Sequence, residues 1–218
     1  MNSQHKYIDT LIIRNPELGT MAADIEDAVN LMYRCYLGDS TIFTCGNGGS
    51  ASDSEHIVGE LMKGFALKRE LPASKRKVIL DLYPDQGDEI CANLQQGIPA
   101  VSLVSSTALT TAILNDLDPA YIFAQQIYAI GRKGDVLVAI STSGNSANVV
   151  NAAKVALAKG MSVISLTGKT GGVLARFSTV SLKAPSSNVG YIQEYHLPIY
   201  HCLCLVLEDL CFGEDSPR

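Results

Sequence analysis

The sequence predicts an α/β fold, a three-layer sandwich in which a five-stranded parallel sheet lies between layers of helices, as in flavodoxin-like proteins. Short apolar runs alternate with stretches of helical periodicity, the pattern of an open parallel sheet that is covered on both faces. Residues 135–140 (DVLVAI) are apolar after the first residue, as expected of a strand buried on both sides. Glycine- and hydroxyl-rich loops follow two of the strands, where such sheets bind ligands.

The first part of the chain is expected to be helical and to precede the sheet. Residues 5–38 carry apolar side chains at helical spacing, which predicts one or two amphipathic helices. The pair Gly38 and Asp39 then interrupts the pattern. Residues 41–45 have high β propensity and predict the first strand, and a helical pattern resumes from the following loop to about residue 65.

The segment 66–97 differs from the sequence on either side. It is charged and irregular, it contains Pro72, Pro84 and Gly87, and a helical piece follows near 88–96. We therefore predict that this segment is an insertion between elements of the core.

After the insertion, strands and helices alternate again. Gly160 is the expected C-cap of one of these helices. Further strands are expected at 99–104, 135–140, 162–166 and 179–183, and further helices at 119–131, at 146–159, shortly after 172 and at 190–212. With no internal repeat, the pattern predicts one domain over residues 1–218, in which 1–38 form the N-terminal helices.

Composition and charge limit the possible partners. The chain has 218 residues, a net charge of −5, and 47% hydrophobic but only 18% charged residues. The negative charge argues against a nucleic-acid surface, which requires clustered Lys and Arg, and the high apolar fraction suggests that other subunits cover part of the surface. There is no apolar run of the ~20 residues that a membrane span needs, and no signal-peptide core. We expect a cytoplasmic protein that binds neither membranes nor nucleic acid.

The cysteines do not indicate a metal site or disulfide bonds. No two of them have C-x-x-C spacing, and their surroundings are apolar. In a cytoplasmic chain they are expected to be small buried hydrophobic residues.

Residues 141–146 (STSGNS) are predicted to bind a phosphate. They follow a buried strand and open a helix, where free backbone N–H groups and the helix dipole favour an anion. A single serine would be enough for an ordinary helix cap. Four hydroxyls, from Ser141, Thr142, Ser143 and Ser146, favour a binding function instead.

A second loop, residues 46–50 (GNGGS), also lies between a strand and a helix. Its glycines, among them Gly48 and Gly49, permit positive φ and a close approach of backbone to ligand. The spacing matches neither the G-x-G-x-x-G dinucleotide motif nor a P-loop. Two loops of this kind at successive crossovers support a phosphate site.

Two pairs of residues are candidates for chemistry. His56 and Glu60 are four apart in one helical segment, and Gln193 and His201 are eight apart in another. Each pair can face a shared cleft, because residues at such spacings lie toward one side of a helix. A carboxylate and an imidazole beside a phosphate site are the groups needed to move a proton on a sugar phosphate.

Together these motifs resemble the sugar isomerase (SIS) domain family, and within it the phosphoheptose isomerases. The matching stretches are CGNGGSASDSEHIVGEL (45–61), LNDLDPAYIFAQQI (114–127), GDVLVAISTSGNSANVV (134–150), MSVISLTGKTGGVLA (161–175) and IQEYHLPIYH (192–201). They cover most of the chain beyond the first forty residues and outside 66–97.

The resemblance implies a function and a set of site residues. The implied reaction is the aldose–ketose isomerisation of sedoheptulose 7-phosphate to D-glycero-D-manno-heptose 7-phosphate through an enediolate, in a homotetramer with active sites at subunit boundaries. Glu60 and His201 would be the acid–base pair, and His56, Glu60, Gln193 and His201 would bind zinc where zinc is present. The implied substrate-binding residues are Asn47, Gly48, Gly49, Ser50, Glu60, Asn115, Asp116 (in an LND turn), Ser141, Thr142, Ser143, Ser146 and Gln193.

The chain departs from the family pattern near the expected sugar pocket. Gly64, next to Lys63, and Tyr191 occupy positions where Arg is usual, and the 66–97 segment is longer than in compact members. These changes concern the exact substrate more than the chemistry. Two alternatives stay open. One is a non-catalytic SIS protein of the kind that associates with the replication initiator DnaA, although that kind lacks the glutamate and final histidine present here. The other is a different sugar-phosphate isomerase of the same fold.

Overall fold

The computed structural model describes residues 3–214 and residue 216. Five parallel strands form one sheet in the order β2-β1-β3-β4-β5. The strands are β1 (Ile42–Cys45), β2 (Ala100–Ser102), β3 (Val136–Ile140), β4 (Ser162–Thr167) and β5 (Val180–Lys183). The predicted fold class is confirmed, and all five expected strands are present.

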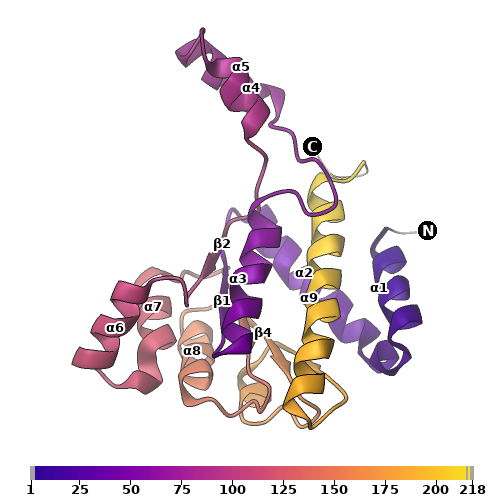
Figure 1. The fold of residues 1–218 in the computed structure, drawn as a ribbon, viewed down its shortest axis with the longest axis vertical. Helices are drawn as coiled ribbons and strands as arrows, with labels where there is room; N and C mark the ends of the chain where they lie inside the picture. Colours follow the sequence, from indigo (N-terminus) through magenta and orange to yellow (C-terminus); the bar gives the residue numbers. More distant parts are fainter. Residues whose placement is uncertain (1–2, 215, 217–218) are drawn as a thin grey trace.

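Helices cover both faces of the sheet (Figure 1). On one face α2 (Ala22–Leu37), α3 (Gly49–Met62) and α9 (Val189–Phe212) pack on the strands, and α1 (Ser3–Arg14) packs on α9. On the other face lie α6 (Thr107–Asp116), α7 (Ile122–Ile130) and α8 (Ala147–Ala158). Short 3₁₀ helices complete the chain: η1 (Pro16–Met21), η2 (Pro119–Tyr121) and η3 (Leu174–Phe177). In the described part of the chain, no helix is long and apolar enough to cross a bilayer.

Strand β3 shows why the sheet needs two helical layers. Val136 and Val138 belong to the core beneath α2, α3 and α9, whereas Leu137 and Ala139 belong to the core beneath α7 and α8. Successive side chains of a strand point to opposite faces, and all five residues of β3 are buried. The strand order changes direction beside β1, whose neighbours are β2 and β3. The loops after β1 and β3 therefore border the crevice where sheets of this order bind ligands.

The 66–97 segment is more regular than the sequence predicts. It forms α4 (Ala73–Leu82) and α5 (Gly87–Asn93), a helical pair that projects from the body (Figure 1). Pro72 immediately precedes α4 and Pro84 follows it, so the prolines bracket a helix where proline is tolerated. All of α4 is described, and none of its residues is fully buried. A helix of this length is marginal by itself in water, and α4 packs on α5.

Helix α6 was also missed. The expected LND turn is its C-terminal end, with Asn115 and Asp116 as the last two residues. The sequence TALTTAILND is rich in β-branched residues, which have low helix propensity. Ile113 is the one buried side chain of this fully described helix, so it lacks the apolar stripe that would have revealed it.

A buried ion pair joins the end of α3 to α9. Glu208 on α9 is bound by Arg69 Nε at 2.8 Å and by three backbone N–H groups of the loop after α3, at 2.7–3.2 Å. Arg69 also donates to the carbonyl oxygens of Glu60 and Leu61, at 3.0 and 2.6 Å. These carbonyls belong to the last turn of α3, where the helix supplies no partners. The ion pair therefore fixes how α3 lies along α9.

We predict that Glu208→Ala destabilises the protein by about 3–5 kcal/mol, because it leaves the charge of Arg69 buried without its partner and unpairs three part-buried backbone donors. Urea denaturation measures the loss. Asp81→Ala is a matched control, since Asp81 pairs with Lys77 on the surface and the change should stay within about 0.5 kcal/mol. Equal losses in the two variants would contradict this role for the buried pair.

Candidate active site

Helices α3 and α9 lie side by side in the same direction, and this brings the expected acid–base residues together. Gly49 faces Gln193, His56 contacts Tyr200 and His201, and the loop after α3 binds Glu208. His56 Nε2 lies 3.0 Å from Glu60 Oε1, and the rings of His56 and His201 are 5.0 Å apart, edge to face. Residues that are 140 positions apart in the sequence thus form one cluster.

His201 is held as a neutral base. Burial, and then the nearby His56, lower its pKa below the ordinary value, while Glu60 acts in the opposite direction. Its Nε2 atom is buried and has no hydrogen-bond partner. An unpaired ring nitrogen in a buried position is costly, so this atom lacks the partner that a ligand or a substrate would supply. The side chain of Glu60 is 13% exposed and is also approached by Lys63 Nζ, at 3.4 Å.

Two further residues complete the cluster. The hydroxyl of Tyr200 lies 3.0 Å from His56 Nδ1 and 3.3 Å from Asp53 Oδ1. The sequence contains hints of both, because Asp53 is one helical turn before His56 and Tyr200 precedes His201. They were missed because their contact depends on the register of α3 against α9.

Gln193 lies apart from the other three. A Cβ atom on Gly49 would lie 2.3 Å from Gln193 Nε2, so the glutamine amide rests on the first turn of α3. Eight residues separate Gln193 from His201, a rise of about 12 Å along a helix. The structure therefore brings together His56, Glu60 and His201 but places Gln193 near the loop 46–50.

The loop 141–146 is built as a binding loop. Ser146 occupies the N-cap position of α8, yet its side chain makes no capping bond. Its hydroxyl lies 3.1 Å from that of Ser141 instead, and the hydroxyl of Ser143 accepts from Asn145 N at 3.1 Å. Gly144, at φ +66°, passes so close to Gly171 that a Cβ atom would lie 2.1 Å from its carbonyl oxygen. No serine side chain of this loop therefore accepts a hydrogen bond from the backbone N–H groups in the first turn of α8, the groups that can bind an anion.

The loops 46–50 and 141–146 are neighbours. Asn47 and Asn148 exchange two amide hydrogen bonds of 2.9 Å, which link the turn after β1 to the start of α8. Asn47, Gly48 and Gly49 are exposed, whereas Ser50 is buried. Thr142 is half-buried, and its carbonyl accepts from Gly168 N at 2.9 Å.

Two expected site residues lie elsewhere in the chain. Asn115 Nδ2 donates to Asp116 Oδ1 at 2.8 Å, and both residues are exposed. Helix α6, which carries them, is separated from α9 by the sheet and by α3 (Figure 1). Within one chain they do not join the histidine cluster.

The phosphate loops and the acid–base cluster are also separated along the axis of α3. Gly49 begins α3 beside the loops, and Glu60 is eleven residues further along, a rise of about 16 Å. That is longer than an extended seven-carbon sugar phosphate. Within one chain, α3 therefore carries the carboxylate and the imidazole away from the phosphate loop.

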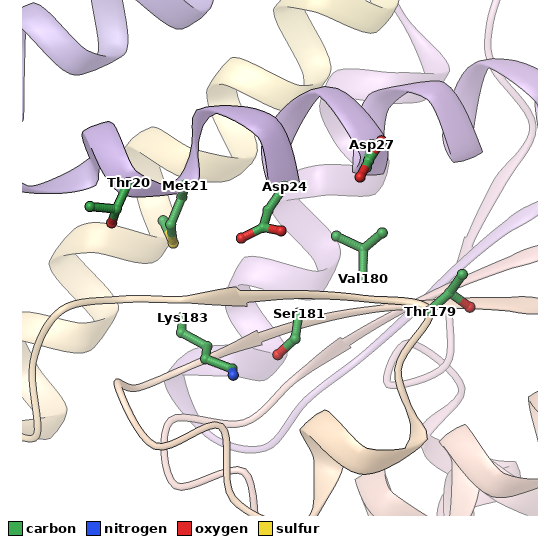
Figure 2. Close-up of a pocket in the computed structure, with 8 residues that line it drawn as sticks. All are labelled: Thr20, Met21, Asp24, Asp27, Thr179, Val180, Ser181 and Lys183. Carbon is green, nitrogen blue, oxygen red and sulfur yellow. The ribbon is translucent and has the colours of Figure 1, made fainter.

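A separate cavity of about 390 Å³ lies between the start of α2 and strand β5 (Figure 2). Asp24, Asp27 and Lys183 line it together with hydroxyl groups. None of the expected site residues is among its lining residues, and strand β5 is on the opposite side of β3 and β4 from β1. This cavity is therefore separate from the candidate site.

The histidine cluster contains donor atoms that suit a metal ion. Two histidines and a glutamate are a donor set found in catalytic zinc sites, and the unpaired Nε2 of His201 is a free donor. In the described residues, however, no three His, Cys, Asp or Glu side chains are grouped closely enough to hold an ion. The donor types fit zinc, whereas their present spacing does not form a site.

His196 has a structural function. It is fully buried, and its Nε2 atom donates to the carbonyl of Thr167 at 3.2 Å, which ties α9 to β4. Burial lowers its pKa to about 4. The ring is therefore neutral at pH 7.

Comparisons with known proteins identify the family of the chain. The SIS domain family model matches residues 7–77 and 91–168, and the interruption falls in the α4–α5 pair. The chain is 37% identical to the phosphoheptose isomerase of Shewanella denitrificans over 195 residues, 88% of this chain and 86% of the relative, and 38% identical to that of Shewanella loihica over the same shares.

Solved structures show the same relationship. A phosphoheptose isomerase from Neisseria gonorrhoeae superposes with a TM-score of 0.72 at 32% identity, covering 94% of this chain and 96% of the other. One from Francisella tularensis gives 0.74 at 29% identity, covering 96% and 100%. The fold and the two loops thus define an SIS domain protein. Within that class, the chain belongs to the phosphoheptose isomerase family.

We predict that His196 makes stability depend on pH. The unfolded chain binds a proton at this residue below about pH 6.5, and the folded protein does so only near pH 4, so stability is full above pH 6.5 and falls as the pH drops toward 4. Denaturant unfolding at pH 7 and pH 5 measures how much stability is lost between the two pH values. In His196→Gln, this pH-dependent loss should be smaller by about 1–2 kcal/mol. An unchanged pH dependence in this variant would contradict the prediction.

Proposed function

We propose that the protein is a phosphoheptose isomerase that converts sedoheptulose 7-phosphate to D-glycero-D-manno-heptose 7-phosphate. The observation that carries the proposal is the contact of His56, Glu60 and His201 across α3 and α9. The named function of the relatives, which the chain matches over most of its length, supports the same reaction. The presence of Glu60 and His201 favours an enzyme over a non-catalytic SIS protein.

The reaction requires two kinds of proton transfer. Glu60 removes the proton from the carbon beside the ketose carbonyl and returns it to the former carbonyl carbon, through an enediolate. His201, which is neutral and has an unpaired nitrogen, moves a proton between the two neighbouring oxygens. The proton that leaves one carbon is added to the neighbouring carbon, and the proton that leaves one oxygen is added to the neighbouring oxygen, so the substrate and the product have the same atoms.

The phosphate is held by backbone N–H groups at the start of α8 and by the hydroxyls of Ser141, Thr142, Ser143 and Ser146. Asn47, Gly48 and Gly49 line the neighbouring turn, and Gln193 contacts the sugar from α9. Ser50, which was also expected to bind the substrate, is buried at the end of this turn, and its N–H donates to the carbonyl of Asn47 at 3.1 Å. Binding of the remote phosphate supplies energy that positions the reacting carbons.

The working form is a homotetramer in which neighbouring subunits share each site. The rise of about 16 Å between the loops and Glu60 supports this arrangement, and so does the location of Asn115 and Asp116 away from α9, which leaves them free to reach a neighbour. Val78, Leu82 and Tyr83 on the projecting α4–α5 pair are exposed, as expected of a surface that another subunit covers. The cytoplasmic location stays a prediction.

Zinc is a further part of the proposal. Of the four implied ligands, His56, Glu60 and His201 would hold the ion, whereas Gln193, about 12 Å from His201 along α9, would not reach it within one chain. When bound, zinc would polarise the carbonyl and stabilise negative charge on oxygen. Glu60 would then be less available as a base. It would act as a zinc ligand in the metal-bound site and as the general base in the metal-free site.

We predict that Glu60→Gln and His201→Ala each lower turnover of sedoheptulose 7-phosphate by about 10²–10⁴-fold, because each removes a proton-transfer group. Coupled assays measure turnover, and light scattering should show the mass of four 23.3 kDa chains in both variants. Glu194→Gln, an exposed carboxylate on the same helix, is the matched control and should keep wild-type turnover. Full activity in either test variant would exclude that residue from the mechanism.

We predict that protein purified without chelator contains about one zinc ion per chain. Elemental analysis measures the metal, and His56→Ala should lower its content. EDTA should reduce turnover, and added zinc should restore it. Full turnover by metal-free protein would exclude the ion from the reaction.

A further inference from the structure

The phosphate loop after β3 is held from behind by the turn 167–174, which follows β4. Gly168 N donates to the carbonyl of Thr142 at 2.9 Å, and Leu174 N donates to the carbonyl of Gly144 at 2.8 Å. Both carbonyls belong to residues of the phosphate loop. The position of that loop therefore depends on the position of the turn.

The peptide group between Thr167 and Gly168 connects this turn to α9. Its N–H is the group that donates to Thr142, and its carbonyl oxygen accepts from Ala184 N at 2.8 Å and from His196 Nε2 at 3.2 Å. A trans peptide group is planar, and its N–H and C=O point in opposite directions. The hydrogen bonds to α9 and to the phosphate loop thus lie at the two ends of one rigid unit. A donor that holds the oxygen also sets the direction of the N–H.

His196 is suited to hold this oxygen. It is fully buried on α9, and its Nδ1 atom has no hydrogen-bond partner. A carbonyl oxygen can only accept, so the ring proton is on Nε2, where it meets a partner. Burial lowers the pKa of the ring to about 4, and the ring is therefore a neutral donor at pH 7.

The same peptide is enclosed between α9 and the phosphate loop. A Cβ atom on Gly168 would lie 2.6 Å from Ile192 Cδ1 and 2.9 Å from the carbonyl oxygen of Thr142. Ile192 precedes His196 by four residues, so the two side chains lie on the same side of α9. Helix α9 thus contacts this peptide through two side chains, one apolar and one that donates a hydrogen bond.

We propose that His196 is a positioning residue for phosphate binding: its Nε2–H group holds the Thr167–Gly168 peptide, and this peptide holds the carbonyl of Thr142 and with it the phosphate loop. Loss of the histidine donor leaves the peptide oxygen to the N–H of Ala184. The peptide is then freer to turn, and its N–H is no longer directed at Thr142.

The expected effect is on substrate binding more than on proton transfer. The phosphate is remote from the reacting carbons, and a bound substrate keeps the same phosphate contacts before and during proton transfer. A weaker phosphate site therefore raises KM more than it lowers kcat. This inference rests on the phosphate site of the proposed function, and binding of inorganic phosphate tests that site without turnover.

The test compares variants of the full-length protein. His196→Leu fills the buried space but has no donor, and it should raise KM for sedoheptulose 7-phosphate about tenfold, the effect of losing one hydrogen bond. The change in kcat should be less than about threefold. The Kd of inorganic phosphate, measured by calorimetry, should rise by the same factor as KM. His196→Gln places an amide N–H close to the position of Nε2, and it should restore both constants to within about threefold of wild type.

Gln126→Leu is the matched control. Gln126 is buried on α7 and donates to the carbonyls of Leu103 and Ile122, both at 2.9 Å. Its replacement also removes a buried donor and lowers stability, but it leaves the turn 167–174 in place. This variant should keep the wild-type KM and the wild-type Kd of phosphate, which separates positioning from a general loss of stability.

Hydrogen exchange supplies a second measurement. The amide of Gly168 should exchange about tenfold faster in His196→Leu than in wild type, because its bond to Thr142 opens more often, and it should be unchanged in Gln126→Leu. If His196→Leu does not fold, His196→Asn takes its place, because the shorter asparagine amide does not reach the carbonyl of Thr167.

Three results would overturn the positioning role. They are wild-type KM and phosphate affinity in the variant without the donor, an equal loss of affinity in Gln126→Leu, and a failure of His196→Gln to restore affinity. A wild-type protein that binds inorganic phosphate with the expected dependence on His196, but does not isomerise sedoheptulose 7-phosphate, would refute the proposed function alone.

Discussion

The register between α3 and α9 is the constraint on which the candidate site depends. Three contacts set it at successive levels: the amide of Gln193 against Gly49, the hydroxyl of Tyr200 against His56, and the carboxylate of Glu208 against Arg69 and the loop after α3. A shift by one residue would turn neighbouring side chains by about 100° around a helix and separate His56 from His201. The buried ion pair costs free energy to form, because both charges are removed from water, but removing one partner costs still more. Such a pair therefore holds the register between α3 and α9.

The structure divides the expected site into two parts with different physical requirements. At the carboxyl ends of β1 and β3, backbone donors and hydroxyls form an environment for an anion without adding a fixed positive charge. Further along α3, burial and ring packing keep His201 neutral and hold Glu60 against His56. A single chain holds the two parts too far apart for one substrate. Oligomerisation is therefore part of the proposed mechanism and not only a source of stability.

The sequence predicted the sheet, the two loops and the pairing of His56 with Glu60, because these features follow from local patterns. Strand periodicity, glycine spacing and helical spacing each act over a few residues. The contacts of Tyr200 with His56, and of Arg69 with Glu208, join residues about 140 apart, and no local pattern encodes them. Helices α4 and α6 were missed because they bury few side chains, so neither shows an apolar stripe.

The most direct test of the shared site is complementation between two inactive variants. Glu60→Gln has intact phosphate loops, and Ser141→Ala combined with Ser143→Ala has an intact acid–base cluster. The account predicts that mixed oligomers, formed by dissociating and reassembling the two variants together, recover turnover of sedoheptulose 7-phosphate, because some sites receive an intact loop from one chain and an intact Glu60 from another. Mixed oligomers that stay as inactive as the separate variants would contradict it.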